Sequence, residues 1–243
     1  MAAVVGIDVG GTFTDLFYSR DGIHAHRICK VPSTPHDPSS GLIDALNVAE
    51  VPQDDLSLIL HGTTIATNAI IERRGARCAL VTTKGFRDIL ELGRRDRPDF
   101  YGLTGIQNPL VPRDLRFELE ERMDHKGNVL RALDPAEARR LAEMLKEEKV
   151  EAVVVSFLHS YANPSHEELV ASIFREAEPG WEVVTSAQVI REYYEFERTS
   201  TAAVQAYLQP LIRRYANNLL ARLSDWGFAR QTLAMQSNGG LVP

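Results

Sequence analysis

No stretch of this sequence approaches the about 20 consecutive apolar residues that a membrane span requires, and its first residues lack the basic region of a secretory signal peptide. Cysteine is scarce. Cys29 and Cys78 are far apart, and their spacing fits neither a metal-ligand motif nor a redox motif. These absences predict a reduced, cytoplasmic setting without membrane contact.

The composition also lacks the bias of a disordered or nucleic-acid-binding chain. Hydrophobic residues make up 44% and charged residues 25% of the 243 residues, close to globular averages. The net charge of −6 argues against a nucleic-acid surface, although it says nothing about a substrate. The length suffices for one large domain or two small ones with a hydrophobic core.

The most informative segment is residues 6–15, Gly-Ile-Asp-Val-Gly-Gly-Thr-Phe-Thr-Asp. An apolar run ends there in Gly10 and Gly11, and apolar and polar side chains alternate afterwards. This pattern predicts a strand, a tight turn and a second strand. A dinucleotide fold or a P-loop needs a helix after its glycines, and the glycine spacing matches neither motif.

A glycine hairpin of this kind can bind phosphate, because no Cβ atom blocks the approach of an anion to the backbone N–H groups. Thr12 and Thr14 add hydroxyl donors, and Asp8, at the end of the first strand, can hold a hydrated magnesium ion. The pattern resembles the phosphate hairpin of actin- and hexokinase-type proteins. The alternative is an ordinary hairpin with a Gly-Gly turn.

A second polar group starts at His61, where a predicted strand ends and a helix begins, so that free N–H groups point toward a cleft. His61 could position a substrate oxygen or transfer a proton. Thr63, Thr64 and Asn68 could contact a substrate carbonyl or a transferred phosphate. Without other context the simpler alternative is favoured, in which a threonine caps the helix and His61 belongs to the core.

An arginine-rich stretch at residues 94–101 offers a third candidate. Arg94 could grip an anionic substrate through bidentate guanidinium contacts. A solvated loop or a subunit interface explains the stretch equally well.

Periodicity and turn residues predict an α/β chain that begins β-β-β-α-β-α-β. Strands are expected near residues 3–9, 13–19, 23–30, 58–60, 78–82, 116–122, 152–157, 181–185 and 233–236. Helices are expected near residues 38–49, 65–71, 135–148, 163–177 and 197–223. Pro210 makes the last of these one kinked helix or two joined helices.

Six segments, taken together, resemble one family. They are residues 6–15, 61–69, 81–88 (Val-Thr-Thr-Lys-Gly-Phe-Arg-Asp), 94–101, 197–201 (Glu-Arg-Thr-Ser-Thr) and 235–240 (Met-Gln-Ser-Asn-Gly-Gly). The order and content resemble the hydantoinase A/5-oxoprolinase family, which includes ATP-dependent carboxylase subunits for acetone and acetophenone. The resemblance implies ATP-dependent opening of a cyclic amide such as a hydantoin or 5-oxoproline, or phosphorylation of a carbonyl compound before carboxylation. It also implies that residues 61–68 form part of a substrate cleft, in place of the simpler alternative given above.

The resemblance implies roles for individual residues. Asp8, Asp15 and His61 would be catalytic, with Asp8 holding Mg²⁺ through water and Asp15 orienting the turn or the metal-bound water. ATP phosphates would lie against Gly10, Gly11, Thr12, Phe13 and Thr14. The substrate would lie against Thr63, Thr64, Asn68 and Arg94.

The implied fold is the first lobe of an actin-like (ribonuclease H-like) ATPase, with a mixed sheet whose first strands are antiparallel. A Rossmann-type parallel sheet is the alternative. Residues 1–185 would form the amino-terminal lobe, and residues 195–243 would begin the following hydantoinase A region. The implied partners are a small-molecule substrate and a hydantoinase B-type subunit or domain, and we expect the full-length protein to be an oligomer.

The resemblance also exposes a gap, because members of the family carry a second Asp-x-Gly-Gly-Thr hairpin in a second lobe. Residues 238–240 are not expected to replace it, since no acidic residue precedes the glycines and no strand is predicted after them. Half of the phosphate clamp is therefore missing, and we expect residues 1–243 alone to bind ATP weakly or not at all and to be inactive. A nucleotide-switched activator or chaperone of the same superfamily is a further alternative.

Overall fold

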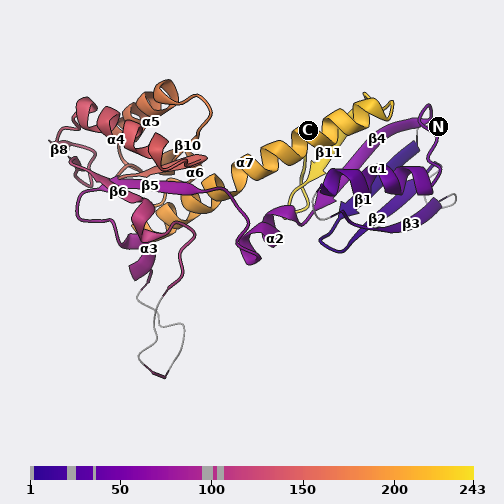
Figure 1. The fold of residues 1–243 in the computed structure, drawn as a ribbon, viewed down its shortest axis with the longest axis horizontal. Helices are drawn as coiled ribbons and strands as arrows, with labels where there is room; N and C mark the ends of the chain where they lie inside the picture. The colour runs from indigo at the N-terminus through magenta and orange to yellow at the C-terminus, as the bar shows by residue number, and fades with distance from the viewer. Residues whose placement is uncertain (1–2, 21–25, 35–36, 95–100, 103–106) are drawn as a thin grey trace. The chain divides into compact units, whose positions relative to one another are not determined.

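The computed structural model describes residues 3–20, 26–34, 37–94, 101–102 and 107–243. The chain divides into two compact units: Met1–Arg74 with Ile212–Pro243 form unit 1, and Gly75–Leu211 form unit 2 (Figure 1). Part of the strand predicted at 23–30 and most of residues 94–101 lie outside the described residues.

Unit 1 is built on a six-stranded mixed sheet with the order β12-β11-β4-β1-β2-β3. Its strands are β1 (Ala3–Val9), β2 (Phe13–Ser19), β3 (His26–Pro32), β4 (Leu56–Thr63), β11 (Gln231–Met235) and β12 (Leu241–Val242). The first three strands are antiparallel neighbours, whereas β4 is parallel to both β1 and β11. The prediction of strand, turn and strand at residues 6–15 is confirmed, and so is the mixed sheet.

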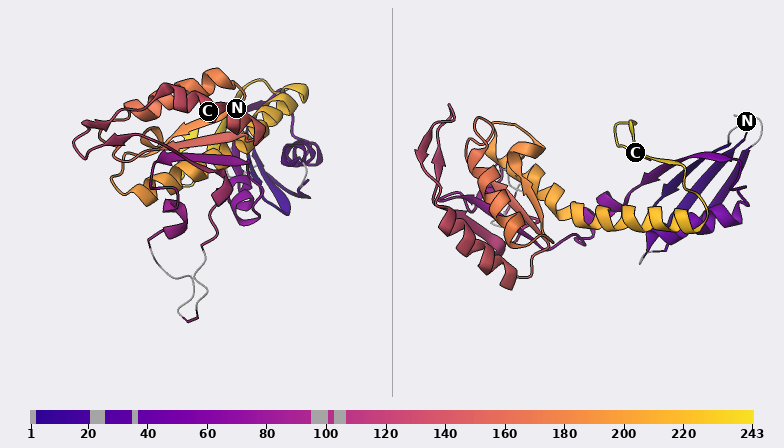
Figure 2. Two further views of the ribbon diagram at one scale, coloured as in Figure 1. Left: turned by 60° about the vertical axis from the view of Figure 1, so that its left-hand side comes forward. Right: turned by 90° about the horizontal axis from the view of Figure 1, so that it is seen from above.

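Helices α1 (Pro38–Val48) and α2 (Ile65–Ile71) belong to unit 1, together with the second half of α7 (Glu195–Asp225). Helix α1 begins where the Asp37 side chain accepts a hydrogen bond from the Ser39 N–H and Pro38 occupies the first turn. Apolar side chains of α1 and α7 share one core with the same face of β1 and β2. Figure 2 shows the ribbon of α7 running along the sheet that β1 and β2 belong to. The opposite face of β2 leaves Phe13 and Phe17 exposed.

The carboxyl-terminal segment corrects one expectation. Residues 237–240 form a turn in which Gln236 N donates to Gly240 O at 2.8 Å, and β12 then pairs antiparallel with β11. A strand therefore does follow the glycines, although no acidic residue precedes them. Gly239 has a φ of 83°, which glycine adopts without strain and which makes the tight turn possible.

The two units also differ from the sequence division at residues 185–195. Strand β11 pairs with β4, so the end of the chain is hydrogen-bonded into the sheet that its beginning forms. Gly75–Leu211 lie between these two parts in sequence and form their own unit. The boundary between an amino-terminal region and a following hydantoinase A region stays a prediction about sequence families.

Unit 2 contains an all-parallel sheet with the order β10-β9-β5-β6. Its elements are β5 (Cys78–Thr83), α3 (Ile89–Leu92), a 3-10 turn (Arg113–Leu115), β6 (Arg116–Leu119), β7 (Arg122–Met123), β8 (Val129–Arg131), α4 (Pro135–Glu147), β9 (Ala152–Ser156), α5 (Ser165–Ala177), β10 (Glu182–Thr185) and α6 (Ser186–Val189). Every residue of β5 and β9 is buried, as parallel strands covered on both faces require. Helices α4 and α5 lie on one side of the sheet and the start of α7 on the other (Figure 1).

Helix α7 continues through Pro210 as one element, which resolves the alternative between one kinked helix and two joined helices. In the part of the chain that the structure describes, no helix combines the length and the apolar character needed to cross a membrane.

A buried carboxylate holds the loop after β9. Glu167, fully buried on α5, accepts hydrogen bonds from Phe157 N at 2.8 Å, Ala187 N at 3.0 Å and Ser186 Oγ at 2.6 Å. Burial raises the pKa of the Glu167 carboxyl group, and these donors oppose the rise. The guanidinium of buried Arg198 donates to Phe157 O and stabilises the same loop.

Replacing Glu167 with alanine should lower the free energy of unfolding by about 3–5 kcal/mol, because three buried donors lose their acceptor and a nearby buried charge loses its counter-charge. Urea titration of both variants measures the loss. Glu168→Ala is the matched control, since this neighbouring side chain is exposed and its removal should leave stability unchanged. Equal stability of the two variants would contradict this account.

Candidate functional site

The candidate site lies at the carboxyl ends of β1 and β4. The two strands are parallel, so Val9 and Thr63 end side by side, and Thr63 Oγ1 donates to Val9 O at 3.2 Å. Beyond Val9 the chain turns through Gly10, whose N–H donates to Phe13 O at 3.0 Å. Ligands of α/β sheets commonly bind at the carboxyl ends of strands, where loops rather than ladder bonds face solvent.

Asp8 and Asp15 stand directly opposite each other on β1 and β2, on the exposed face of the sheet. Lys30 pairs with Asp15 at 3.0 Å. In the described part of the chain no side chain pairs with the Asp8 carboxylate. A Cβ atom on Gly62 would lie 3.2 Å from Asp8 Oδ1, so the glycine leaves the carboxylate room beside β4.

The glycine turn lies against α2. A Cβ atom on Gly11 would come within 2.8 Å of Asn68 Nδ2, a contact too close to be tolerated without movement. Asn68 Nδ2 in turn donates to Thr64 Oγ1 at 3.2 Å. Three predicted site residues, Gly11, Thr64 and Asn68, are therefore neighbours, and glycine at position 11 permits the close approach.

The two threonines of the hairpin face different surroundings. Thr12 is exposed in the turn, whereas Thr14 is fully buried on the core side of β2, with its hydroxyl 3.0 Å from Ser33 Oγ. Ser33 Oγ also donates to Gly10 O at 2.7 Å. Thr14 is thus linked to the turn through Ser33, on the buried side of the sheet. Phe13, in contrast, is exposed and lies beside Lys30.

His61 lies on the opposite face of the sheet from Asp8. It is only 4% exposed, and its Nε2 is 2.8 Å from the hydroxyl oxygen of Tyr215 on α7. Burial lowers the pKa of the imidazole to about 4. The structure therefore does not bring His61 together with the two aspartates, and its catalytic role stays a prediction that this geometry does not favour.

The lowered pKa of His61 should make the free energy of unfolding depend on pH. The unfolded imidazole titrates near 6.5 and the folded one near 4, so between these values the unfolded chain binds a proton that the folded chain does not. The free energy of unfolding should therefore fall by about 3 kcal/mol as the pH falls through this window. Denaturant titrations from pH 7 to pH 4 measure the fall, and His61→Gln should abolish this part of it. An imidazole that titrates near 6.5 by NMR would contradict the assignment.

Arg94 belongs to unit 2, whereas the other predicted site residues belong to unit 1. Its Nε lies 2.6 Å from Glu197 Oε1 at the start of α7, and its side chain is largely exposed. The ion pair with Arg94 lowers the pKa of Glu197. In the described residues Arg94 thus has a structural partner, and a contact with substrate stays a prediction.

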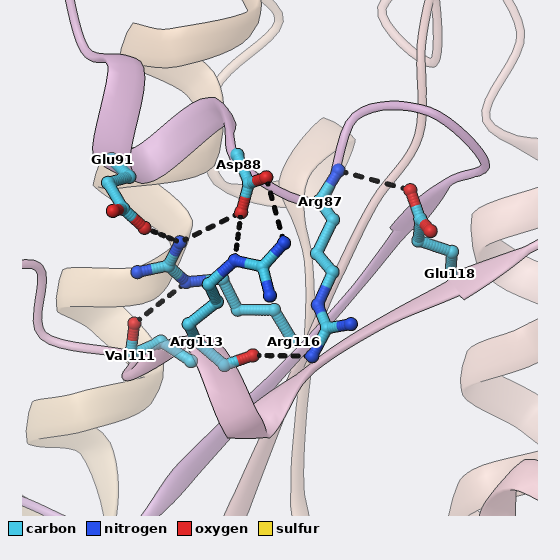
Figure 3. Close-up of polar contacts among 7 residues, drawn as sticks. All are labelled: Arg87, Asp88, Glu91, Val111, Arg113, Arg116 and Glu118. Atoms are coloured by element: carbon cyan, nitrogen blue, oxygen red, sulfur yellow. Dashed lines mark hydrogen bonds and ion pairs between the residues drawn. The ribbon is translucent and has the colours of Figure 1, made fainter.

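The stretch at residues 81–88, one of the six that resemble the family, ends in a network of charged residues in unit 2 (Figure 3). Arg116 is 2% exposed and donates to Val111 O and Glu91 Oε2, each at 3.0 Å. Asp88 accepts two hydrogen bonds from Arg113, at 2.9 and 3.2 Å. The network holds α3 against the chain that leads into β6.

Arg116→Leu should destabilise unit 2 by about 3 kcal/mol, because the Val111 carbonyl and the Glu91 carboxylate both lose a charged donor. Arg113→Leu is the control: its guanidinium is exposed, so water replaces the lost pair and the effect should be clearly smaller. Thermal unfolding compares the two. A larger loss for Arg113→Leu would refute the ranking.

Ser33 and Tyr215 were not predicted from the sequence. Ser33 N also donates to Thr12 O at 2.9 Å, so this residue bonds to both sides of the turn. Nothing in the sequence around either residue signals such a contact, because their partners are 19 or more positions away. Among the described residues no group of three or more His, Cys, Asp or Glu side chains could by itself hold a metal ion.

Comparison with family models supports the resemblance. Residues 4–177 match the hydantoinase/oxoprolinase N-terminal region, and residues 198–243 match the hydantoinase/oxoprolinase region that follows.

Curated relatives match along almost the whole chain. An uncharacterised protein of Methanocaldococcus jannaschii is 41% identical over 98% of this chain and 35% of its own length. The caprolactamase subunit alpha of Pseudomonas jessenii is 36% identical over 98% of this chain and 36% of its own length. The acetophenone carboxylase gamma subunit of Aromatoleum aromaticum is 36% identical over 97% of this chain and 35% of its own length. The chain thus spans about a third of these relatives.

Solved structures share the fold. ATP-dependent caprolactamase from Pseudomonas jessenii superposes with a TM-score of 0.84 at 36% identity, over 99% of this chain and 36% of that one. Nucleotide-free acetone carboxylase superposes with a TM-score of 0.83 at 28% identity, over 98% of this chain and 36% of that one.

Proposed function

This chain belongs to the hydantoinase/oxoprolinase family, and from that premise we propose that it is the phosphate-binding lobe of an ATP-dependent enzyme that opens cyclic amides such as hydantoins or 5-oxoproline. The observation that carries the proposal is the exposed Asp8, which pairs with no side chain in the described part of the chain and lies beside a glycine turn at the carboxyl ends of two parallel strands. Relatives named 5-oxoprolinase and ATP-dependent caprolactamase support the reaction class.

The residues at the turn fit a nucleotide phosphate with a magnesium ion. Asp8 would hold a hydrated Mg²⁺ through its carboxylate, and the ion would offset the negative charge of the phosphates. The Gly10 N–H is already bonded to Phe13 O, so the backbone N–H group of exposed Gly11 and the exposed Thr12 hydroxyl would donate to the phosphate oxygens. Asp15, held by Lys30, keeps a second carboxylate beside Asp8 to orient water.

The neighbouring helix start supplies neutral polar groups. Thr64 and Asn68 lie next to Gly11, where they can contact the transferred phosphate or the amide carbonyl. The Thr63 hydroxyl donates a hydrogen bond to Val9 O, so Thr63 holds the ends of β1 and β4 together. Bound ATP would transfer its terminal phosphoryl group to the amide oxygen and leave as ADP, which would make the ring carbon electrophilic enough for attack by water. The ring C–N bond would then break as its nitrogen takes up a proton, and a second water would release inorganic phosphate from the acyl group.

The proposed reaction needs more protein than this chain contributes, because the chain spans only 36% of the length of the caprolactamase subunit and 35% of that of the acetophenone carboxylase subunit. Two of them are named as subunits. We therefore propose a partner subunit or domain of the hydantoinase B type and a second set of phosphate contacts beyond this lobe. Arg94 is proposed as a substrate contact in the assembled enzyme.

A ketone carboxylase subunit is the second candidate. The acetophenone carboxylase gamma subunit matches this chain with the same 36% identity as the caprolactamase subunit. In that case the phosphorylated species is an enol rather than an amide, and the phosphate-binding residues keep the same roles.

The full-length protein, with its partner subunit, should convert a hydantoin or 5-oxoproline to the open acid with one ADP released per ring. Asp8→Asn should reduce this turnover by about a hundredfold or more, because the metal loses its carboxylate. Asp44→Asn is the matched control, since Asp44 is an exposed aspartate on α1 and should leave turnover unchanged.

The products separate the candidates. Turnover of a ketone that requires bicarbonate would establish the carboxylase instead. Ring opening without ATP, or full activity of Asp8→Asn, would refute the assigned phosphate site.

A further inference from the structure

Tyr215 and His61 form a contact that the proposed chemistry does not use. The pair is buried, with exposed fractions of 7% and 4%, and joins residues 154 positions apart. Their rings lie 5.6 Å apart, tilted by 37°. A buried hydrogen-bonded pair of this kind is costly to leave unsatisfied, so it fixes the two elements that carry it.

The pair lies on the core side of the sheet, near the strand ends that lead into the glycine turn. His61 stands next to Ile7 in the register of β4 and β1, one residue before the position of Asp8. Thr63, two residues beyond His61, donates to Val9 O, the last carbonyl before Gly10. Movement of His61 therefore moves both strand ends on which the turn is built.

Helix α7 is itself held in place on this core. Trp226 Nε1 donates to Asn47 Oδ1 at 2.8 Å, and the Arg222 guanidinium pairs with Asp37 at the start of α1. Leu219 and Leu223 are buried in the same core. Tyr215 is thus held in a fixed position, and the hydrogen bond from its hydroxyl group to His61 holds β4 relative to α7.

We propose that Tyr215 and His61 are positioning residues: the pair sets the ends of β1 and β4, and with them Asp8 and the glycine turn, from the core side of the sheet. His61 takes no part in proton transfer. This inference rests on the proposed phosphate site and assigns no contact between the pair and any ligand.

Alternation along β4 separates the two roles. Successive residues of a strand face opposite sides, so His61 faces the core while Gly62 faces Asp8. A proton shuttle at His61 would have to cross the sheet. Burial also lowers the imidazole pKa to about 4, which leaves His61 neutral at the pH of the cell.

The test compares Tyr215→Phe with Tyr207→Phe in the full-length protein. Both tyrosines are buried on α7, but Tyr207 belongs to unit 2. Hydrogen-exchange mass spectrometry should show about tenfold faster exchange of residues 8–14 in Tyr215→Phe, the factor that one ordinary hydrogen bond supplies. Exchange of β9 should be unchanged in this variant, and Tyr207→Phe should leave residues 8–14 as in the wild type. Equal exchange of residues 8–14 in the two variants would overturn the proposal.

Substitution of His61 separates positioning from chemistry. Glutamine can place an amide group where Nε2 lies, so His61→Gln should keep the exchange of residues 8–14 and most of the turnover, whereas His61→Ala should lose both by about tenfold. If His61→Gln keeps the exchange but is as inactive as His61→Ala, His61 reacts directly and the proposal fails. The exchange comparison needs no substrate, so it stands or falls independently of the reaction assigned above.

Discussion

The parallel pairing of β1 with β4 is the constraint on which the candidate site depends. Parallel neighbours cannot be joined by a short hairpin, so the chain must cross over between them, and here α1 is part of the crossover. The crossover brings together two strand ends that are 54 residues apart, Val9 and Thr63. The glycine turn and the start of α2 become neighbours only because both follow these ends.

A second constraint is that buried polar groups need partners. Several stretches shared with the family contain polar residues that the structure uses internally: Thr14 binds Ser33, and Arg198 binds the loop after β9. In unit 2 the buried Arg116 likewise has Val111 O and Glu91 as partners. A polar motif can therefore be specific to a family because it satisfies a buried network, without any contact with a ligand.

Local patterns predicted much of the fold. Alternation gave β1 and β2 with their observed limits, and the Asp37-Pro38 signal placed the start of α1. Long-range pairing was beyond such patterns: the division into two units follows from β11 joining β4, and β12 is only two residues long. The glycine turn could be predicted from its glycines, and its phosphate-binding role stays a proposal. The contacts of Ser33 and Tyr215 could not be predicted, since their partners lie in segments distant in sequence.

The face on which a residue lies decides what it can do, and a one-residue step along a strand reverses that face. The stretch from His61 to Thr64 is continuous in sequence, and therefore reads as one polar group. In the structure the His61 side chain is buried in the core, where it contacts Tyr215. Gly62 leaves room for the Asp8 carboxylate on the other face, and Thr64 lies with Asn68 beside the turn. The exposed face thereby carries the residues that we propose to bind phosphate, while the buried face holds the strand ends in place.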